Sequence, residues 1–141
     1  MSADKIKNAR DFIECVPQVL ALKMELVEIA DGAAVIRMPY DPQIVGDPET
    51  GVIHGGAVST LMDTCCGTAV IAHPDNPGGT ATISLRIDYL RAAAPGQAVT
   101  ARAECYHLTR SVAFVRGTAH DEETGCPVAT ATGTFTVETK A

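Results

Sequence analysis

The chain has 141 residues, of which 46% are hydrophobic and 20% charged, and its formal net charge is −6. This length suits a single domain over residues 1–141 with its own core. The negative charge argues against nucleic acid and against a membrane surface as partners, and no apolar run is long enough to span a bilayer. The charged N-terminus has no apolar signal segment, and the five cysteines form no CxxC pair. We therefore expect a reduced, cytoplasmic protein.

The first predicted element is a short amphipathic helix. Residues 4–15 place apolar side chains on one helical face, and Pro17 ends the helix. Residues 1–20 are therefore expected to form an N-terminal helical extension.

A β-hairpin and a loop come next. Asp31-Gly32 is a dipeptide typical of tight hairpin turns, and it separates two strand-like runs at 22–29 and 33–38. Residues 39–50 are rich in Pro, Asp and Gly, which predicts a loop.

The stretch from Gly51 to His73 predicts a central helix, entered through His54-Gly55-Gly56. Its single formal charge is Asp63, and the face opposite its apolar residues carries only small or hydroxyl-bearing side chains. A surface helix would show a charged face, so this helix is expected to be buried almost all round. The apolar residues at helical spacing are Val58, Leu61, Met62, Cys65, Ala69 and Val70.

The rest of the chain predicts strands. Apolar and polar residues alternate over 80–90, and turn signals separate three further strands at 97–107, 112–120 and 127–137. Six strands and one long helix give an α+β fold in which the sheet bends around the helix. One small sheet covers only part of such a helix, so a second copy of the chain is expected to cover the rest, in a symmetric dimer at least.

The helix start offers hydrogen-bond donors to a ligand. The first amides of a helix lack intrahelical partners and carry partial positive charge, and Gly55 and Gly56 leave the backbone accessible. Such a site can stabilise a carbonyl oxygen as it becomes an oxyanion. The alternative is that Gly-Gly only permits tight packing.

Asp63 lies nine residues after His54, roughly 13 Å along a helix. It is too far to act on a carbonyl held at its own helix start, but it can act on one held by an antiparallel partner chain. A buried carboxylate suits general-base or nucleophilic work. The alternative is a structural carboxylate that accepts hydrogen bonds.

Other side chains give weaker signals. Cys65 and Cys66 are adjacent in the helix, where free cysteines usually act as small apolar residues. His54, Asp63 and His73 do not have the spacing of a known metal motif, so no metal site is expected. Four arginines in or near the strands either meet phosphates of a charged ligand or are solvated: Arg86, Arg91, Arg110 and Arg116.

The segment GVIHGGAVSTLMDT at 51–64 resembles the signature of hot-dog-fold thioesterases, in the branch of the phenylacetate-degradation enzyme. The similarity continues through TISLRIDYLRAA at 82–93, APG at 94–96, RSVAFV at 110–115 and VATATGTF at 128–135. It covers roughly residues 20–138. The resemblance implies a curved antiparallel sheet around a long central helix, a dimer that often pairs into a tetramer, and hydrolysis of acyl-CoA without a further cofactor.

The resemblance also implies roles for single residues. Asp63 matches the catalytic carboxylate, as base or nucleophile, and Gly55 matches the glycine whose N–H polarises the thioester carbonyl of the other subunit. His54 matches the histidine that helps to shape the site. Thr82 matches a Ser or Thr that positions the attacking water, which agrees with its place on the more polar face of its strand.

One position departs from the family pattern. Relatives commonly have an asparagine six residues before the histidine, and here that position is Pro48, between Asp47 and Glu49. Glu49 is a candidate second carboxylate. The candidate substrate-binding set is Glu49, Gly56, Arg91 and Arg110.

Three functions follow from these observations. The first is an acyl-CoA thioesterase, with arginines meeting the CoA phosphates. The second is a non-catalytic acyl-CoA binding protein, which the Pro48 departure motivates. The third is a hydratase or dehydratase acting on acyl thioesters, although the HGG-to-Asp63 spacing suits the thioesterase better.

Overall fold

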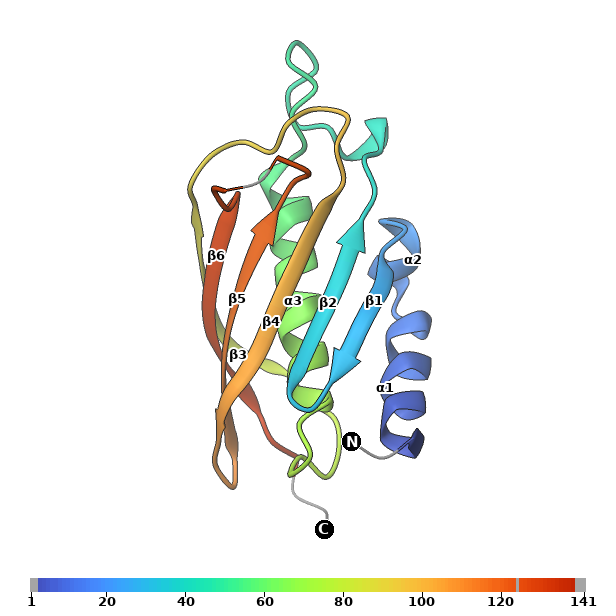
Figure 1. The fold of residues 1–141 in the computed structure, drawn as a ribbon, viewed down its shortest axis with the longest axis vertical. Coiled ribbons are helices and arrows are strands. Elements are labelled where there is room, and N and C mark those ends of the chain that lie inside the picture. Colours follow the sequence, from blue (N-terminus) through green and yellow to red (C-terminus); the bar gives the residue numbers. More distant parts are fainter. Residues whose placement is uncertain (1–2, 124, 139–141) are drawn as a thin grey trace.

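A computed structural model of the chain describes residues 3–123 and 125–138, and it has one antiparallel sheet curved around a central helix, α3 (Gly55–Ile71) (Figure 1). The spatial order of the six strands is β1-β2-β4-β5-β6-β3. This architecture confirms the predicted hot-dog fold. The strands are β1 (Glu25–Ala30), β2 (Ala33–Met38), β3 (Thr82–Tyr89), β4 (Val99–Leu108), β5 (Val112–His120) and β6 (Ala129–Thr136).

The N-terminal segment forms two helices, α1 (Ala3–Cys15) and α2 (Pro17–Ala21). Pro17 separates them as expected, but it also starts α2, because proline is well accommodated in the first turn of a helix. Ala9 and Ile13 anchor α1 on the core. The first two and last three residues of the predicted domain, and Thr124 between the strands predicted at 112–120 and 127–137, lie outside the described residues.

The predicted strands are confirmed with small changes at their ends. The β1–β2 turn places Gly32 at φ +67°, in the left-handed region that favours glycine. β1 begins at Glu25, three residues later than predicted. The sheet edge formed by β3 is open: among the described strands β3 pairs with β6 alone, and Ile83 on it is 55% exposed.

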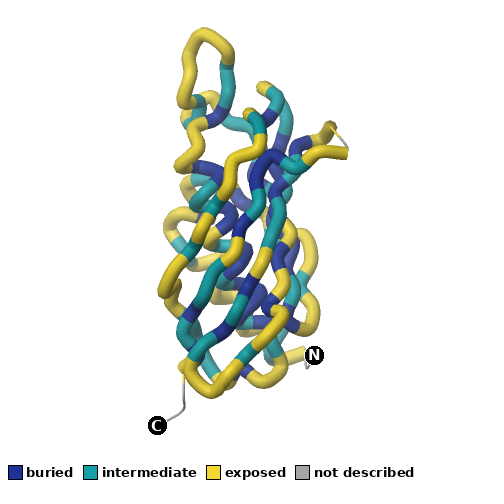
Figure 2. Tube along the Cα trace, turned by 90° about the vertical axis from the view of Figure 1, so that its left-hand side faces the viewer, coloured by how far each residue is buried: buried dark blue, intermediate teal, exposed yellow. Residues whose placement is uncertain are grey.

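α3 packs its apolar face against β2, β4 and β5, and Leu61, Cys65 and Val70 are completely buried there. Figure 2 shows the buried residues gathered between sheet and helix, whereas the loop before α3 is exposed. One chain covers only part of α3, as predicted, and burial of the remaining face by a second copy stays a prediction. Gly55, Gly56 and Asp63 are exposed, and only part of the small-residue face, such as Thr68, is covered.

Among the described helices, none has the length and apolar character needed to cross a membrane.

Candidate active site on the open face of α3

His54 caps the start of α3. Its backbone is extended, with φ −64° and ψ 136°, and its Nδ1 accepts the N–H of Gly56 at 2.8 Å. An acceptor at Nδ1 places the ring proton of neutral His54 on Nε2. A Cβ on Gly56 would lie 2.8 Å from Nδ1, so only glycine lets the ring sit over this turn. The helix cap therefore accounts for the presence of both His54 and Gly56 without a bound ligand.

Gly55 offers a backbone donor next to this cap. In the described part of the chain no group accepts a hydrogen bond from its N–H, as expected for the first residue of a helix. Its carbonyl is held by the hydroxyl of Tyr89, at 2.8 Å, from the end of β3. Tyr89 thus fixes the peptide group after Gly55, a role that sequence reasoning did not assign to it.

Asp63 lies in the middle of the same open face and is held by the edge strand. The Thr82 hydroxyl donates to Asp63 Oδ1 at 2.6 Å, a short, charge-assisted hydrogen bond. This bond orients the carboxylate and leaves Oδ2 for another partner. The Asp63 side chain is exposed in the single chain, so its burial by a partner copy stays a prediction.

A cavity of about 160 Å³ opens beside the Asp63–Thr82 pair. Gly67 and Phe135 line it, and the apolar side of α1 covers it. A carboxylate at the mouth of an apolar cavity is suited to bringing polar chemistry to one end of an apolar ligand.

These residues lie within a segment that matches a known family. Residues 50–128, more than half of the chain, match the family described as the thioesterase superfamily. The chain belongs to the thioesterase superfamily. The matched segment contains the HGG turn, Asp63 and Thr82, and the enzyme is a thioester hydrolase of the hot-dog fold.

Several relatives support this assignment. The Escherichia coli K12 medium/long-chain acyl-CoA thioesterase YigI is 29% identical, over 89% of this chain and 88% of its own. A Pseudomonas aeruginosa crystal structure is 36% identical with a TM-score of 0.82, covering 94% of this chain and 98% of the other. The phenylacetic acid degradation protein PaaI of Thermus thermophilus, in a mutant form, is 30% identical with a TM-score of 0.75, covering 86% and 98%. The thioesterase is therefore of the PaaI type.

Arg91 of this thioesterase forms a closed ion pair. Its guanidinium donates to both oxygens of Asp121, at 2.6 and 2.8 Å, and to the Cys126 carbonyl at 2.8 Å. The pair raises the pKa of Arg91 and holds that of Asp121 well below its usual range. These contacts account for Arg91 without a bound phosphate and favour a structural role. Asp121 was missed in the sequence because its partner lies thirty residues away.

Glu49 and Arg110 lie away from the Asp63 carboxylate. Glu49 is exposed in the projecting loop before α3, where its N–H donates to Asp47 Oδ1. Hydrogen bonds from Thr50 and Glu49 lower the pKa of Asp47. Arg110 is exposed in the β4–β5 turn, at the end of the sheet opposite the start of α3 (Figure 1). Their roles in substrate binding stay predictions.

The cysteines of α3 are unsuited to nucleophilic work. Burial, with the nearby Asp63 charge, raises the pKa of Cys66 to about 12, and burial raises that of Cys65 further. Both thiols are therefore protonated at neutral pH. Within the described ranges, no group of three His, Cys, Asp or Glu residues is arranged to hold a metal ion.

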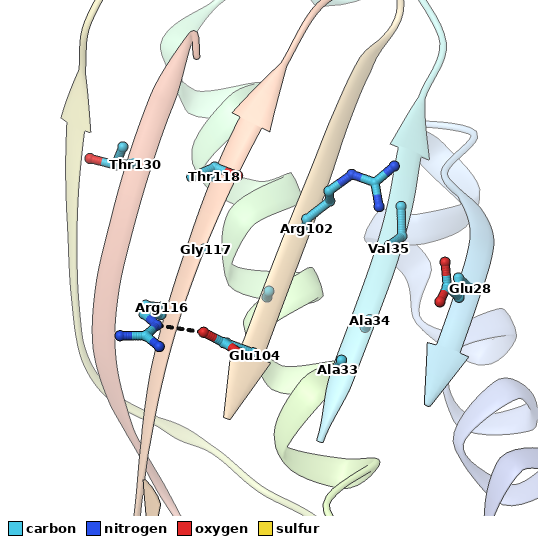
Figure 3. Close-up of a pocket in the computed structure, with 11 residues that line it drawn as sticks. Glu28, Ala33, Ala34, Val35, Arg102, Glu104, Arg116, Gly117, Thr118 and Thr130 are labelled. Carbon is cyan, nitrogen blue, oxygen red and sulfur yellow. Dashed lines mark hydrogen bonds and ion pairs between the residues drawn. The ribbon is translucent and has the colours of Figure 1, made fainter. Parts of the chain in front are cut away.

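A larger cavity of about 560 Å³ lies on the other face of the sheet (Figure 3). Small residues such as Gly117 form its floor, and Arg116 at its side pairs with Glu104 at 2.5 Å. It is separated from Asp63 by the whole sheet. Its size alone therefore does not make it the reaction site of this thioesterase.

Proposed function

We propose that the protein hydrolyses acyl-CoA thioesters at sites formed between two copies of the chain, with Asp63 of one copy and the Gly55 N–H of the other. The observation that carries the proposal is the Asp63–Thr82 pair on an open face of α3, where both residues line a largely apolar cavity. The names of the YigI relatives support acyl-CoA with a medium or long chain as the substrate class.

The distance along α3 argues for two copies. Gly55 and Asp63 are eight residues apart, which is about 12 Å along a helix. The two groups of one chain therefore cannot contact the same thioester. A two-fold axis that sets two α3 helices antiparallel brings each Asp63 near the other chain's Gly55.

The edge strand supports the same arrangement. β3 lies beside the open face of α3, offers unpaired backbone groups along one side and carries the exposed Ile83. An open apolar edge pairs readily with another strand. Association of two copies along β3 covers both this edge and the open face, and we expect a homodimer or a dimer of dimers.

The reaction then proceeds in balanced steps. Asp63 accepts a proton from water as the water oxygen attacks the thioester carbonyl carbon. The Gly55 N–H of the other copy donates to the carbonyl oxygen as it becomes negative. The C–S bond breaks, and the proton passes from Asp63 to the CoA sulfur. Thr82 keeps Asp63 oriented throughout.

Labelled water separates this course from direct attack by Asp63. In a single turnover in ¹⁸O water, general-base catalysis places ¹⁸O in the released acid. Nucleophilic attack forms an anhydride, and its hydrolysis at the Asp63 carbonyl leaves an unlabelled oxygen from Asp63 in the acid.

The shared site is tested with two complementary variants. Asp63→Asn removes the base, and Gly55→Pro removes the N–H while suiting the first helical position. Removing one oxyanion donor typically costs about 10²–10³ in rate. Gly55→Ala is the matched control, because it keeps the N–H and its Cβ would make only ordinary contacts, at 3.6 Å, with Tyr89.

The two variants are co-expressed with different tags, and the mixed dimer is purified through both. A mixed dimer contains one site with both groups intact, so roughly half of the wild-type rate is expected. A mixed species as inactive as its parents contradicts the shared site. Acyl-CoA binding without any turnover by the wild type points to the non-catalytic alternative, and hydration of an enoyl-CoA points to the hydratase.

A further inference from the structure

The cavity beside Asp63 runs beneath the N-terminal helix. Asp63 and Thr82 lie at one end of its 160 Å³, and Gly67 and Phe135 form its wall. Its cover comes from Phe12 and Ile13 of α1 and from Val16, which follows α1. α1 lies outside the segment 50–128 that matches the thioesterase superfamily, so the family match by itself assigns it no role.

A second cavity begins where the first ends. It measures about 380 Å³ and shares Phe12 and Ile71 with the first. The rest of its lining is Asp4, Lys5 and Asn8 of α1 and the loop of residues 76–79. Ile71 lies eight residues beyond Asp63, about 12 Å along α3. The two cavities therefore lie along the helix from Asp63 to its C-terminal end, and Phe12 and Ile71 line both of them.

The side chains of Phe12 and Ile71 differ in how freely they can move. Ile71 belongs to the central helix, whose position the sheet fixes. Phe12 is 52% exposed, whereas its neighbour Ile13 is 3% exposed and anchors α1. A half-exposed side chain loses few contacts when it changes rotamer, so Phe12 is the movable side of the passage.

We propose that Phe12 and Ile71 form a gate that sets the length of the acyl chain accepted by the enzyme, an inference that rests on the acyl-CoA activity proposed above. A medium-length linear chain enters beside Asp63, passes over Gly67 and ends at the gate. A longer chain displaces Phe12 and continues into the second cavity. Phe12 and Ile71 are thus specificity residues that touch the substrate far from the reacting carbonyl.

The first test compares octanoyl-CoA with palmitoyl-CoA. Phe12→Ala is expected to raise the palmitoyl-to-octanoyl ratio of kcat/KM by about tenfold or more, and Ile71→Phe to lower it, because small changes in an apolar pocket discriminate at this scale. Leu20→Ala is the matched control, since Leu20 is 65% exposed on α2 and lines neither cavity. Its ratio is expected to equal that of the wild type.

A second variant distinguishes an effect on the passage of the acyl chain from an effect on the packing of α3. A Cβ on Gly67 would lie 3.6 Å from Phe135, an ordinary contact, so Gly67→Ala fits while it narrows the first cavity. Alanine is also the better helix former. We therefore expect Tm to rise while kcat/KM for both substrates falls, a combination that a purely structural role of Gly67 would not give.

The outcomes separate the two proposals. An unchanged ratio in Phe12→Ala, with octanoyl-CoA still hydrolysed, overturns the gate and leaves the thioesterase activity intact. If the wild type hydrolyses no acyl-CoA, the proposed function fails, and calorimetric binding of the same two thioesters to wild type and Phe12→Ala still decides the gate. An unchanged affinity ratio there also overturns it.

Discussion

Asp121 and Asp63 show how the surroundings of a carboxylate suit it either to a structural role or to a catalytic one. Asp121 has a fully buried side chain and receives two bonds from Arg91 and the backbone N–H groups of Ala94 and Glu123. Asp63 is exposed in the single chain and receives one bond, from Thr82. Asp121 has every lone-pair direction engaged, whereas Asp63 keeps an oxygen available for a substrate or a water.

The two carboxylates also differ in what they connect. The Asp121 cluster ties the segment after β3 to the segment after β5, and it needs nothing from another molecule. The Asp63–Thr82 pair lies on a helix face that the chain leaves open, so it can meet another molecule. Saturated carboxylates stabilise the fold, and unsaturated ones on an open face are available for reaction.

Asp63→Asn is the most direct test of whether Asp63 is catalytic rather than structural. Asparagine still accepts the Thr82 hydrogen bond but cannot take a proton or attack a carbonyl. Loss of a general base typically lowers the rate by about 10²–10⁴, and we expect a loss of this size in kcat for acyl-CoA. The free energy of unfolding should stay within about 0.5 kcal/mol of the wild type, because asparagine keeps the Thr82 hydrogen bond and the side chain is exposed in the single chain. Steady-state kinetics and urea unfolding measure both; retained activity would remove Asp63 from the mechanism.

Asp121→Asn should give the opposite result. Removing one member of a buried ion pair costs about 3–5 kcal/mol, and Arg91 is 28% exposed, so we expect a loss of about 2–4 kcal/mol in unfolding free energy. Glu25→Gln, which breaks the exposed pair with Arg37, is the control and should cost under about 1 kcal/mol.

The pH dependence of Asp121 follows from the same pair. The pKa of folded Asp121 lies below its unfolded value of about 3.9. Its contribution is therefore fully present above about pH 4 and is lost as the pH falls below that. The stability difference between wild type and Asp121→Asn should shrink from pH 7 to pH 3 in urea titrations. A difference that grows on acidification would contradict the assignment.

Thr82→Val tests how far orientation of Asp63 matters. Valine keeps the shape of the side chain but removes the donor at 2.6 Å. Hydrogen bonds to charged groups contribute about 1.5–3 kcal/mol when shielded, and this one is exposed in the single chain, so we expect kcat to fall by about tenfold. Thr82→Ser should restore most of the rate. Equal rates in the valine and serine variants would show that the hydroxyl is not used.

The cap at His54 gives the smallest expected effect. His54→Ala and Gly56→Ala each remove the same hydrogen bond, one by deletion and one by a steric clash with the ring. Loss of a helix cap costs about 1 kcal/mol. Because both changes act on one contact, the double variant should cost less than the sum of the two. Additive losses in urea unfolding would place the two residues in separate roles.

Much of the scaffold was predictable because its signals are local. The strand over 112–120 was predicted with its observed ends, and the apolar residues of α3 were found from their spacing alone. The cap residues and the hairpin turn at Gly32 also depend on nearby backbone. Such patterns repeat every two to four residues, so a sequence displays them directly.

Two parts of the prediction needed the tertiary structure. The exposure of Asp63 in the single chain was not evident from the sequence, because the small-residue face of α3 is covered only in part. The prediction of Arg91 as a phosphate ligand did not foresee Asp121, which the β5 strand and its following turn bring beside it. Neither the covering of a helix face nor a contact across thirty residues has a local signature.

The sequence by itself determined the six strands, the central helix with its start at His54-Gly55-Gly56, and the presence of one carboxylate in that otherwise uncharged helix. Only the tertiary structure decided that β3 lies at the edge next to β6, which brings Thr82 within 2.6 Å of Asp63 across nineteen residues of sequence. It also decided that α1 closes the cavity beside them. The physical reason is that propensity and periodicity act over one turn or one strand, whereas strand order and register are set by how all the apolar faces are buried together.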